Sequence, residues 1–168
     1  KHISEKLIRR HPEVFDKNNS KKSISDINKS WEAAKQKEKQ RKNILDGVPI
    51  KLPALLRARR IQEKAANVGF DWKELLPVIE KVDEEIAELK DAVALKNPAN
   101  IKDEMGDVLF SLVNLSRFLD IPAEDALRKT NEKFTSRFRL VEKELELRGS
   151  PVDESSLEEM DERWEQSK

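Results

Sequence analysis

The sequence predicts an all-α protein, and three observations support this fold class. The 168 residues include only four glycines and 5% aromatic side chains, while Ala, Leu, Glu, Lys and Arg, all good helix formers, are abundant. Over residues 53–148, large apolar side chains recur at spacings of three and four, as on one face of a helix. No segment alternates apolar and polar residues for long enough to predict a strand.

The first predicted helix covers residues 53–68. Pro53 suits its first position because a proline there loses no hydrogen bond, and Gly69 is typical of a residue that ends a helix. Asp71 predicts the start of a second helix, since Glu74 three residues later would complete a capping box.

The second and third helices meet at Asn97-Pro98 and are predicted from their apolar stripes. The stripe of the second helix consists of Ile79, Val82, Ile86, Leu89 and Val93. The third helix, about residues 100–119, carries Ile101, Met105, Val108, Leu112, Leu115 and Leu119. Because the connection is short, we expect these two helices to be antiparallel neighbours.

A long fourth helix is predicted between Pro122 and Gly149, because both residues are typical of helix boundaries. Ser155 and Glu158 have the spacing of a capping box, which predicts a short final helix that contains Trp164.

Residues 1–52 differ from the rest of the chain. Their apolar side chains are too few and too scattered to form a core, although 26–42 reads as a highly charged helix and 45–52 as a connector. We therefore expect one domain at 53–168, preceded by a tail that packs loosely or against another chain.

The overall charge argues against two classes of partner. The 33 basic and 33 acidic residues cancel, whereas proteins that bind nucleic acids or membrane surfaces usually carry a basic surplus. No apolar run approaches the length of about 18 residues that a membrane span requires. We expect a cytoplasmic protein without nucleic-acid or membrane partners.

Five acidic residues on the second and third helices form the candidate chemical site. Glu85 and Glu88 are three residues apart, and Glu84 is four residues before Glu88, so their side chains project together from one helix. Glu104 and Asp107 repeat the spacing of three on the next helix. Both pairs flank the apolar stripes, so the antiparallel packing brings them together.

Converging carboxylates indicate a site for a hard divalent cation, because their repulsion is costly without a neutralising charge. The chain has no cysteine and only two histidines, His2 and His11, which excludes a thiolate site and disfavours a histidine site. The alternative is a solvated acidic face, which a chain with 39% charged residues can produce by composition alone. Because two acidic pairs lie on consecutive helices, a metal site is favoured over a solvated acidic face.

Three other residues have structural interpretations. Gly106 inside the third helix is unfavourable by about 1 kcal/mol relative to Ala, which predicts a close helix approach or a crowded ligand. Phe70 and Trp72 are interpreted as core side chains.

The acidic motif has a recognisable form: Glu84-Glu85-x-x-Glu88, fifteen residues, then Glu104-x-x-Asp107. Together with VGFDW (68–72), EKVDEEIAEL (80–89), DEMGDVLFSLVNLSRFL (103–119) and NEKFTSRF (131–138), it resembles the MazG-like nucleoside triphosphate pyrophosphohydrolases over residues 53–168. The resemblance implies an antiparallel four-helix-type bundle that forms a homodimer. It also implies an enzyme that hydrolyses nucleoside triphosphates of varied base to the monophosphate and pyrophosphate, for nucleotide-pool housecleaning or control of a signalling nucleotide.

The resemblance also assigns roles to the acidic residues. Glu85, Glu88, Glu104 and Asp107 match the ligands of Mg²⁺, for which Mn²⁺ can substitute, and Glu84 matches an additional acid that orients the ligands or accepts from water. The ion would position the polyphosphate and acidify the attacking water.

Four residues further along match substrate contacts. Lys133 and Arg137 would meet the triphosphate, Trp164 would stack on the base, and Asn131 would touch a phosphate or the sugar. Without the resemblance, the two cations read as a solvated helix face, Trp164 as a core anchor and Asn131 as a local cap.

Other activities remain open for the same residues. An all-α dUTPase or a phosphoribosyl-ATP pyrophosphohydrolase would share the metal site and the general architecture. A helical interaction module without catalysis would use the acidic residues as a solvated face.

The chain also contains a short internal repeat. SEKLIRRHPEVF (4–15) resembles NEKFTSRFRLVE (131–142), so that Lys6, Arg10 and Trp31 stand where Lys133, Arg137 and Trp164 stand in the second copy. The acidic motif has no first copy. We interpret residues 1–52 as the tail of an upstream pyrophosphohydrolase domain plus a linker, and we expect their deletion to spare activity.

Overall fold

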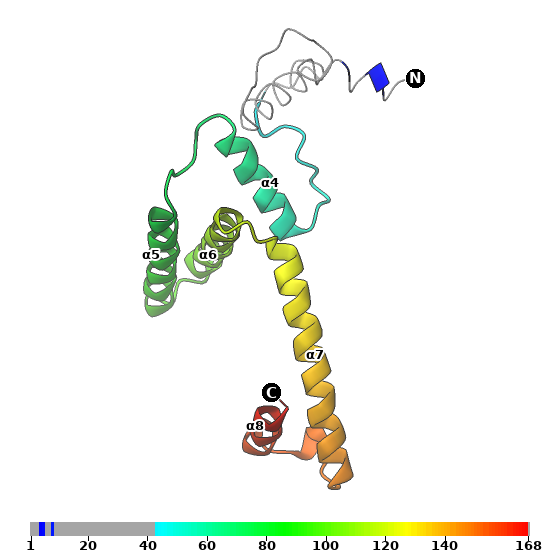
Figure 1. Ribbon diagram of the computed structural model, residues 1–168. Coiled ribbons are helices and arrows are strands. Elements are labelled where there is room, and N and C mark those ends of the chain that lie inside the picture. Colours follow the sequence, from blue (N-terminus) through cyan, green and yellow to red (C-terminus); the bar gives the residue numbers. More distant parts are fainter. Residues whose placement is uncertain (1–3, 6–7, 9–42, 168) are drawn as a thin grey trace. The chain divides into compact units, whose positions relative to one another are not determined.

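The computed structural model describes Ser4, Glu5, Ile8 and residues 43–167 (Figure 1). This part of the chain is helical and contains no strand, which confirms the all-α prediction. Its main helices are α4 (Ala54–Ala66), α5 (Leu75–Ala94), α6 (Pro98–Phe118), α7 (Ala123–Leu147) and α8 (Leu157–Gln166). None of the helices in these residues is long and apolar enough to cross a membrane. The charged helix expected at 26–42 lies outside the described residues.

The chain divides into two compact units, residues 1–120 and residues 121–168. In the first unit, α5 and α6 form a helical hairpin and are the most extensively packed pair of described helices, while α4 also packs on α6 (Figure 1). Asn97 begins α6, because its side-chain oxygen accepts hydrogen bonds from the backbone N–H groups of Ala99 (3.2 Å) and Asn100 (3.4 Å). Pro98 follows at the first helical position, as predicted.

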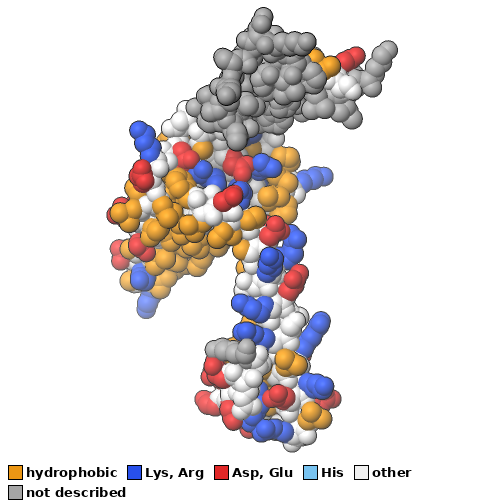
Figure 2. Space-filling model, viewed as in Figure 1, with side chains coloured by type: hydrophobic (Ala, Val, Ile, Leu, Met, Phe, Trp, Pro, Cys, Tyr) orange, Lys and Arg blue, Asp and Glu red, His pale blue; other side chains and the backbone are white. Residues whose placement is uncertain are grey.

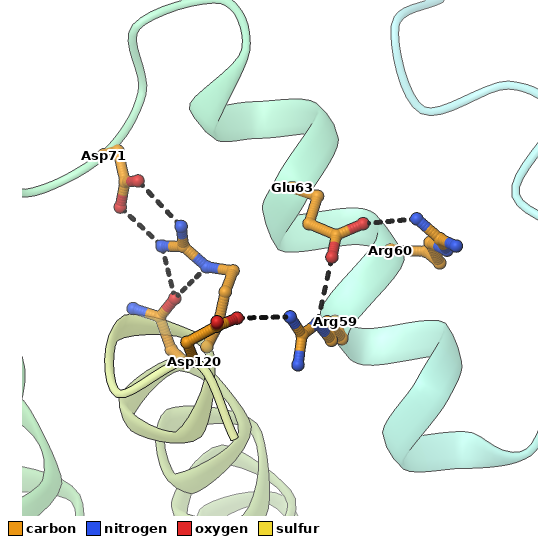
Figure 3. A network of polar contacts seen from close by, with 7 residues as sticks. Arg59, Arg60, Glu63, Asp71 and Asp120 are labelled. Atoms are coloured by element: carbon orange, nitrogen blue, oxygen red, sulfur yellow. Dashed lines mark hydrogen bonds and ion pairs between the residues drawn. The ribbon is translucent and has the colours of Figure 1, made fainter. Parts of the chain in front are cut away.

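The predicted start of α5 at Asp71 is wrong. The helix begins at Leu75, and Glu74 precedes it without any side-chain cap. Asp71 instead accepts hydrogen bonds from the guanidinium of Arg117, at 2.9 Å from Nη1 and 2.6 Å from Nη2 (Figure 3). A bidentate hydrogen bond between charged groups is stronger than a local helix cap. The Asp71 carboxylate therefore binds Arg117 and does not cap α5.

The buried face of α5 includes Val82, as predicted, but its other members lie one position before those of the predicted stripe. Its buried side chains are Val78, Val82, Glu85 and Ala92. Ile79 and Val93, expected in the core, are exposed. Across the hairpin, the buried side chains of α6 are Val108, Ser111, Val113 and Asn114. A carboxylate and two other polar groups thus lie where an ordinary helical hairpin would place apolar side chains.

A row of apolar side chains along α6 and at its end is only partly covered by the described residues. Met105, Leu109, Leu112 and Leu119 recur at helical spacing and are all exposed, and we call them the α6 apolar row. Figure 2 shows hydrophobic side chains gathered over the α5–α6 region. Contiguous apolar surface of this kind is typical of a contact with another chain.

The second unit consists of α7, a short 3₁₀ turn at Val152–Glu154 and α8. Gly149 ends the helical turn after α7 with φ +75°, as predicted. The capping box of α8 is formed by Ser156 and Glu159, so the prediction of Ser155 and Glu158 was one residue early. The Ser155 hydroxyl instead donates to backbone carbonyls in the preceding turn.

Candidate active site

Three of the predicted acidic residues meet between α5 and α6. One carboxylate oxygen from each of Glu85, Glu88 and Glu104 lies within 4.8 Å of the other two, and we call these residues the acidic cluster. Glu85 is only 7% exposed, Glu104 is half-buried and Glu88 is exposed. The antiparallel hairpin produces this arrangement, because it brings the first turns of α6 beside the middle of α5.

The other two predicted acids lie differently. Asp107 is not part of the acidic cluster, although it lines the same cavity as Glu85 and its charge acts on Glu104. Glu84 is exposed, and its carboxylate accepts a hydrogen bond from the Lys81 ammonium at 2.8 Å. Lys81 also pairs with Glu85 at 2.8 Å, so one cation joins the buried carboxylate to an exposed one.

The electrostatics of the acidic cluster show that its negative charge is not fully balanced. Partial burial raises the pKa of Glu104, and the charges of Glu88, Asp107, Glu85 and Asp103 raise it further. The pKa of Lys81 is also raised, but for the opposite reason: its hydrogen bonds to Glu84 and then Glu85 stabilise the charged ammonium. One ammonium therefore faces several carboxylates that compete for positive charge.

The donor set of the acidic cluster suits a metal ion. Its ligand atoms are all carboxylate oxygens, which hard divalent cations prefer, and the three residues are close enough to share one ion. A cation would also relieve the repulsion that raises the pKa of Glu104. The acidic cluster can therefore hold a divalent metal.

A cavity of about 400 Å³ adjoins these carboxylates. Glu85 and Asp107 form part of its wall, and most of the remaining wall is apolar. Phe70 and Trp72, both expected in the core, line this cavity and are 83% and 43% exposed. The core interpretation was wrong because these aromatics lie on the connection between α4 and α5, outside the packed helix faces.

The connection that carries these aromatics is fixed by a polar network (Figure 3). Arg117 binds Asp71 on the connection and also donates to the Asn114 side chain at 3.0 Å from Nε. Near this pair, Arg59 contacts both Glu63 at 2.9 Å and Asp120 at 3.7 Å. The network ties α4 and the α4–α5 connection to the end of α6.

The predicted substrate contacts belong to the second unit. Trp164 is half-buried and its ring lies 5.0 Å from that of Phe134, which also stacks on Phe138 with centroids 5.9 Å apart. Arg137 is half-buried, whereas the other two predicted contacts on α7 are exposed; these are Asn131 and Lys133. The matching residues of the first copy of the repeat lie outside the described residues; these are Lys6, Arg10 and Trp31.

Sequence reasoning missed two features of the first unit. Lys81 precedes Glu84 and Glu85 by three and four residues, a spacing that could have predicted both ion pairs. Gln62 occupies a buried position of α4, and the available signal was its helical spacing from Ala58, Ala65 and Ala66. The close helix approach expected at Gly106 is absent among the described residues, because an added Cβ would meet no atom within 4 Å.

Comparison with known proteins adds family information. Residues 74–141 match the family described as MazG nucleotide pyrophosphohydrolase domain. The chain is 47% identical over 171 residues to the nucleoside triphosphate pyrophosphohydrolase of Escherichia coli (strain K12), in a match that covers 99% of this chain and 65% of that protein. It is 46% identical over 168 residues to the nucleoside triphosphate pyrophosphohydrolase/pyrophosphatase MazG of Thermotoga maritima, covering 99% and 63%.

The chain thus spans slightly less than two thirds of the length of these curated relatives. The domain match includes both halves of the acidic motif, on α5 and α6, and most of α7. Together, the domain match and the identities show that the chain is similar to proteins with a MazG nucleotide pyrophosphohydrolase domain.

Proposed function

We propose that this chain is a Mg²⁺-dependent enzyme that hydrolyses nucleoside triphosphates to the monophosphate and pyrophosphate. The observation that carries the proposal is the convergence of Glu85, Glu88 and Glu104 within 4.8 Å, beside a cavity that can accept a ligand. The names of the two relatives support the substrate class. The buried carboxylate and the raised pKa of Glu104 disfavour a merely solvated acidic face.

In the proposed mechanism, the acidic cluster and Asp107 hold the ion and orient the polyphosphate. Mg²⁺ held there would supply positive charge that offsets the phosphate charges and would make an attacking water more acidic. Lys81 holds the buried Glu85 carboxylate in place through its 2.8 Å ion pair. Glu84 shares that ammonium and orients it.

The second unit contributes the substrate contacts of the mechanism. Lys133 and Arg137, one helical turn apart on α7, offset the charge that develops on the departing pyrophosphate. Trp164 stacks on the base, an interaction that tolerates different bases because each has a π face. Asn131 contacts a phosphate or the sugar. This assignment is consistent with broad base specificity.

Replacement of Glu88 by Gln tests the catalytic role of the acidic cluster. The change removes one ligand charge with little change in shape, and we expect pyrophosphate release to fall by about 100-fold or more. The Asp107→Ala variant should lose activity likewise. The measurement is pyrophosphate release from ATP, GTP, CTP, UTP and dUTP.

The matched control is Glu80→Gln, which removes an exposed carboxylate of α5 outside the acidic cluster and should leave turnover unchanged. Normal turnover by Glu88→Gln would contradict the assignment. Turnover confined to dUTP in the unmodified chain would instead identify a dUTPase.

Metal binding should appear as a change in thermal stability. A cation that binds only the folded chain stabilises it by about 2.7 kcal/mol at a concentration 100 times Kd, so Mg²⁺ should raise Tm relative to EDTA. The measurement is calorimetry at pH 8 with and without MgCl₂.

The Glu104→Gln variant gives this experiment its control. Because the folded pKa of Glu104 is raised, its ionised form opposes folding at pH values above its unfolded pKa, and the penalty lessens as pH falls toward the folded pKa. Removing the charge should therefore raise Tm in EDTA at pH 8 and reduce the further increase caused by Mg²⁺. An equal Mg²⁺ effect in both proteins would argue against the site.

We further propose that two chains associate through the α6 apolar row, so that helices of both copies complete a four-helix-type bundle. The exposure of Met105, Leu109 and Leu112 on one face supports a covering partner, and a second copy offers the same surface by symmetry.

Leu109→Glu should place a charge in this contact and convert the dimer into a monomer, measured by light scattering coupled to size exclusion. Leu147→Glu, which changes an exposed leucine of α7 in the same way, is the control and should leave the mass unchanged. A Leu109→Glu protein that keeps the dimer mass would contradict the proposed interface.

For the domain organisation, we propose that residues 53–168 are the catalytic domain and residues 1–52 a tail and linker. Removal of residues 1–42 should leave kcat/KM unchanged. Removal of residues 1–52 should also spare hydrolysis but raise KM, because it takes away Leu45, which lines the cavity. Steady-state kinetics of both truncations is the measurement, and loss of hydrolysis in the shorter truncation would show that the tail contributes to the site.

A further inference from the structure

Lys81 is a cation with two carboxylate partners on its own helix. Its ammonium nitrogen Nζ lies 2.8 Å from Oε1 of Glu84 and 2.8 Å from Oε1 of Glu85. These residues follow Lys81 on α5 by three and four positions, so all three side chains project from the same side of the helix. One ammonium is therefore shared between a carboxylate outside the acidic cluster and a carboxylate that belongs to it.

The two partners of Lys81 differ in their access to water. The side chain of Glu84 is 56% exposed, whereas that of Glu85 is 10% exposed. Water can solvate the Glu84 carboxylate, and an ion pair at such a position contributes little to stability. The Glu85 carboxylate has little contact with water, so its charge requires a cation at short distance. The Lys81 ammonium is therefore required at Glu85, while its bond to Glu84 is a weaker, alternative contact.

The acidic cluster needs more positive charge than Lys81 supplies. Among the described residues, the ion pair of the acidic cluster is the one between Lys81 and Glu85. A divalent cation held by Glu85, Glu88 and Glu104 would interact with the same buried carboxylate as the ammonium. The two cations would also repel each other, because charges of equal sign a few Å apart oppose one another. Lys81 and a metal ion thus compete for Glu85.

We propose that Lys81 is the resident counter-ion of the metal-free site: it releases Glu85 when a divalent cation binds, and it then pairs with Glu84 alone. The inference rests on the metal site of the proposed function. Before the metal arrives, the ion pair holds Glu85 in place. Because binding of the metal must break this pair, Lys81 weakens the affinity of the acidic cluster for the ion. Glu84 accepts the released ammonium and so makes the exchange possible.

The first test removes the ammonium and measures metal binding without nucleotide. Lys81→Met keeps the length of the side chain, and the calorimetric Kd for Mg²⁺ should fall by about tenfold because no resident cation competes with the ion. The matched control is Lys90→Met, which removes the same charge from an exposed position of α5 outside the acidic cluster and should leave this Kd unchanged. Equal or weaker Mg²⁺ binding by Lys81→Met would overturn the proposal.

Thermal unfolding gives a second measurement on the same variants. In EDTA, Lys81→Met should have a lower Tm than the unmodified chain, because Glu85 loses its counter-ion. The increase in Tm caused by Mg²⁺ should then be larger in Lys81→Met, since the ion binds more tightly. Lys81→Arg keeps a cation and should behave as the unmodified chain in both respects. A Mg²⁺ effect on Tm that is no larger in Lys81→Met than in Lys81→Arg would contradict the competition.

Glu84 provides a test of the exchange itself. Glu84→Gln removes the alternative partner, so Lys81 should remain on Glu85 and the Kd for Mg²⁺ should rise by about fivefold. In a chain that already carries Lys81→Met, the same change should have almost no effect, because no ammonium is left to relocate. An equal effect of Glu84→Gln in both backgrounds would show that Glu84 acts on the metal directly, and the proposed exchange would fail.

These measurements also separate this inference from the proposed hydrolysis, because they contain no nucleotide and require no turnover. If the chain releases no pyrophosphate but Lys81→Met tightens Mg²⁺ binding, the hydrolytic function fails and the role of Lys81 as counter-ion stands. If hydrolysis requires Mg²⁺ but the unmodified chain, Lys81→Met and Lys81→Arg bind the ion equally, the hydrolytic function stands and this inference fails. Absence of Mg²⁺ binding in all three proteins would refute both.

Discussion

The packing of α5 against α6 places the Glu85 carboxylate on a buried helix face, where its charge needs compensation. Burial of a charged group is costly unless it is paired, and Lys81 supplies one partner at 2.8 Å. The same packing brings Glu88 and Glu104 within 4.8 Å of Glu85, which adds more negative charge than one ammonium can balance. A divalent cation would resolve this conflict, so the electrostatics of the hairpin and its proposed chemistry have a common origin.

The cavity depends on a second constraint, the bidentate ion pair between Asp71 and Arg117. Both side chains are largely buried, so the pair is screened less than an ordinary surface salt bridge. It fixes the connection between α4 and α5, which brings Phe70 and Trp72 to the cavity wall. The acidic and aromatic parts of the proposed site thus adjoin, although they come from different segments of the chain.

Several features of the first unit point beyond a single isolated hairpin. The α6 apolar row leaves large side chains in solvent, and the buried faces of the hairpin include Glu85, Ser111 and Asn114. A helical hairpin with apolar side chains on its exposed face and polar side chains on its buried face is poorly suited to being stable as an isolated unit. The proposed second copy would supply apolar cover, and the proposed metal would offset the charge of the carboxylates between the helices.

The sequence by itself determined the all-α class, the approximate bounds of the helices after residue 53 and the pairing of two acidic motifs on adjacent helices. These features depend on local spacing and on the chemistry of Pro98, Gly149 and similar boundary residues, which act within a few residues of chain. Only the tertiary structure decided that Glu85 would be buried and that Asp71 would bind Arg117 instead of capping a helix. Each of these outcomes depends on a partner that is distant in sequence or on the exact rotation of one helix against another, and periodicity alone does not specify either.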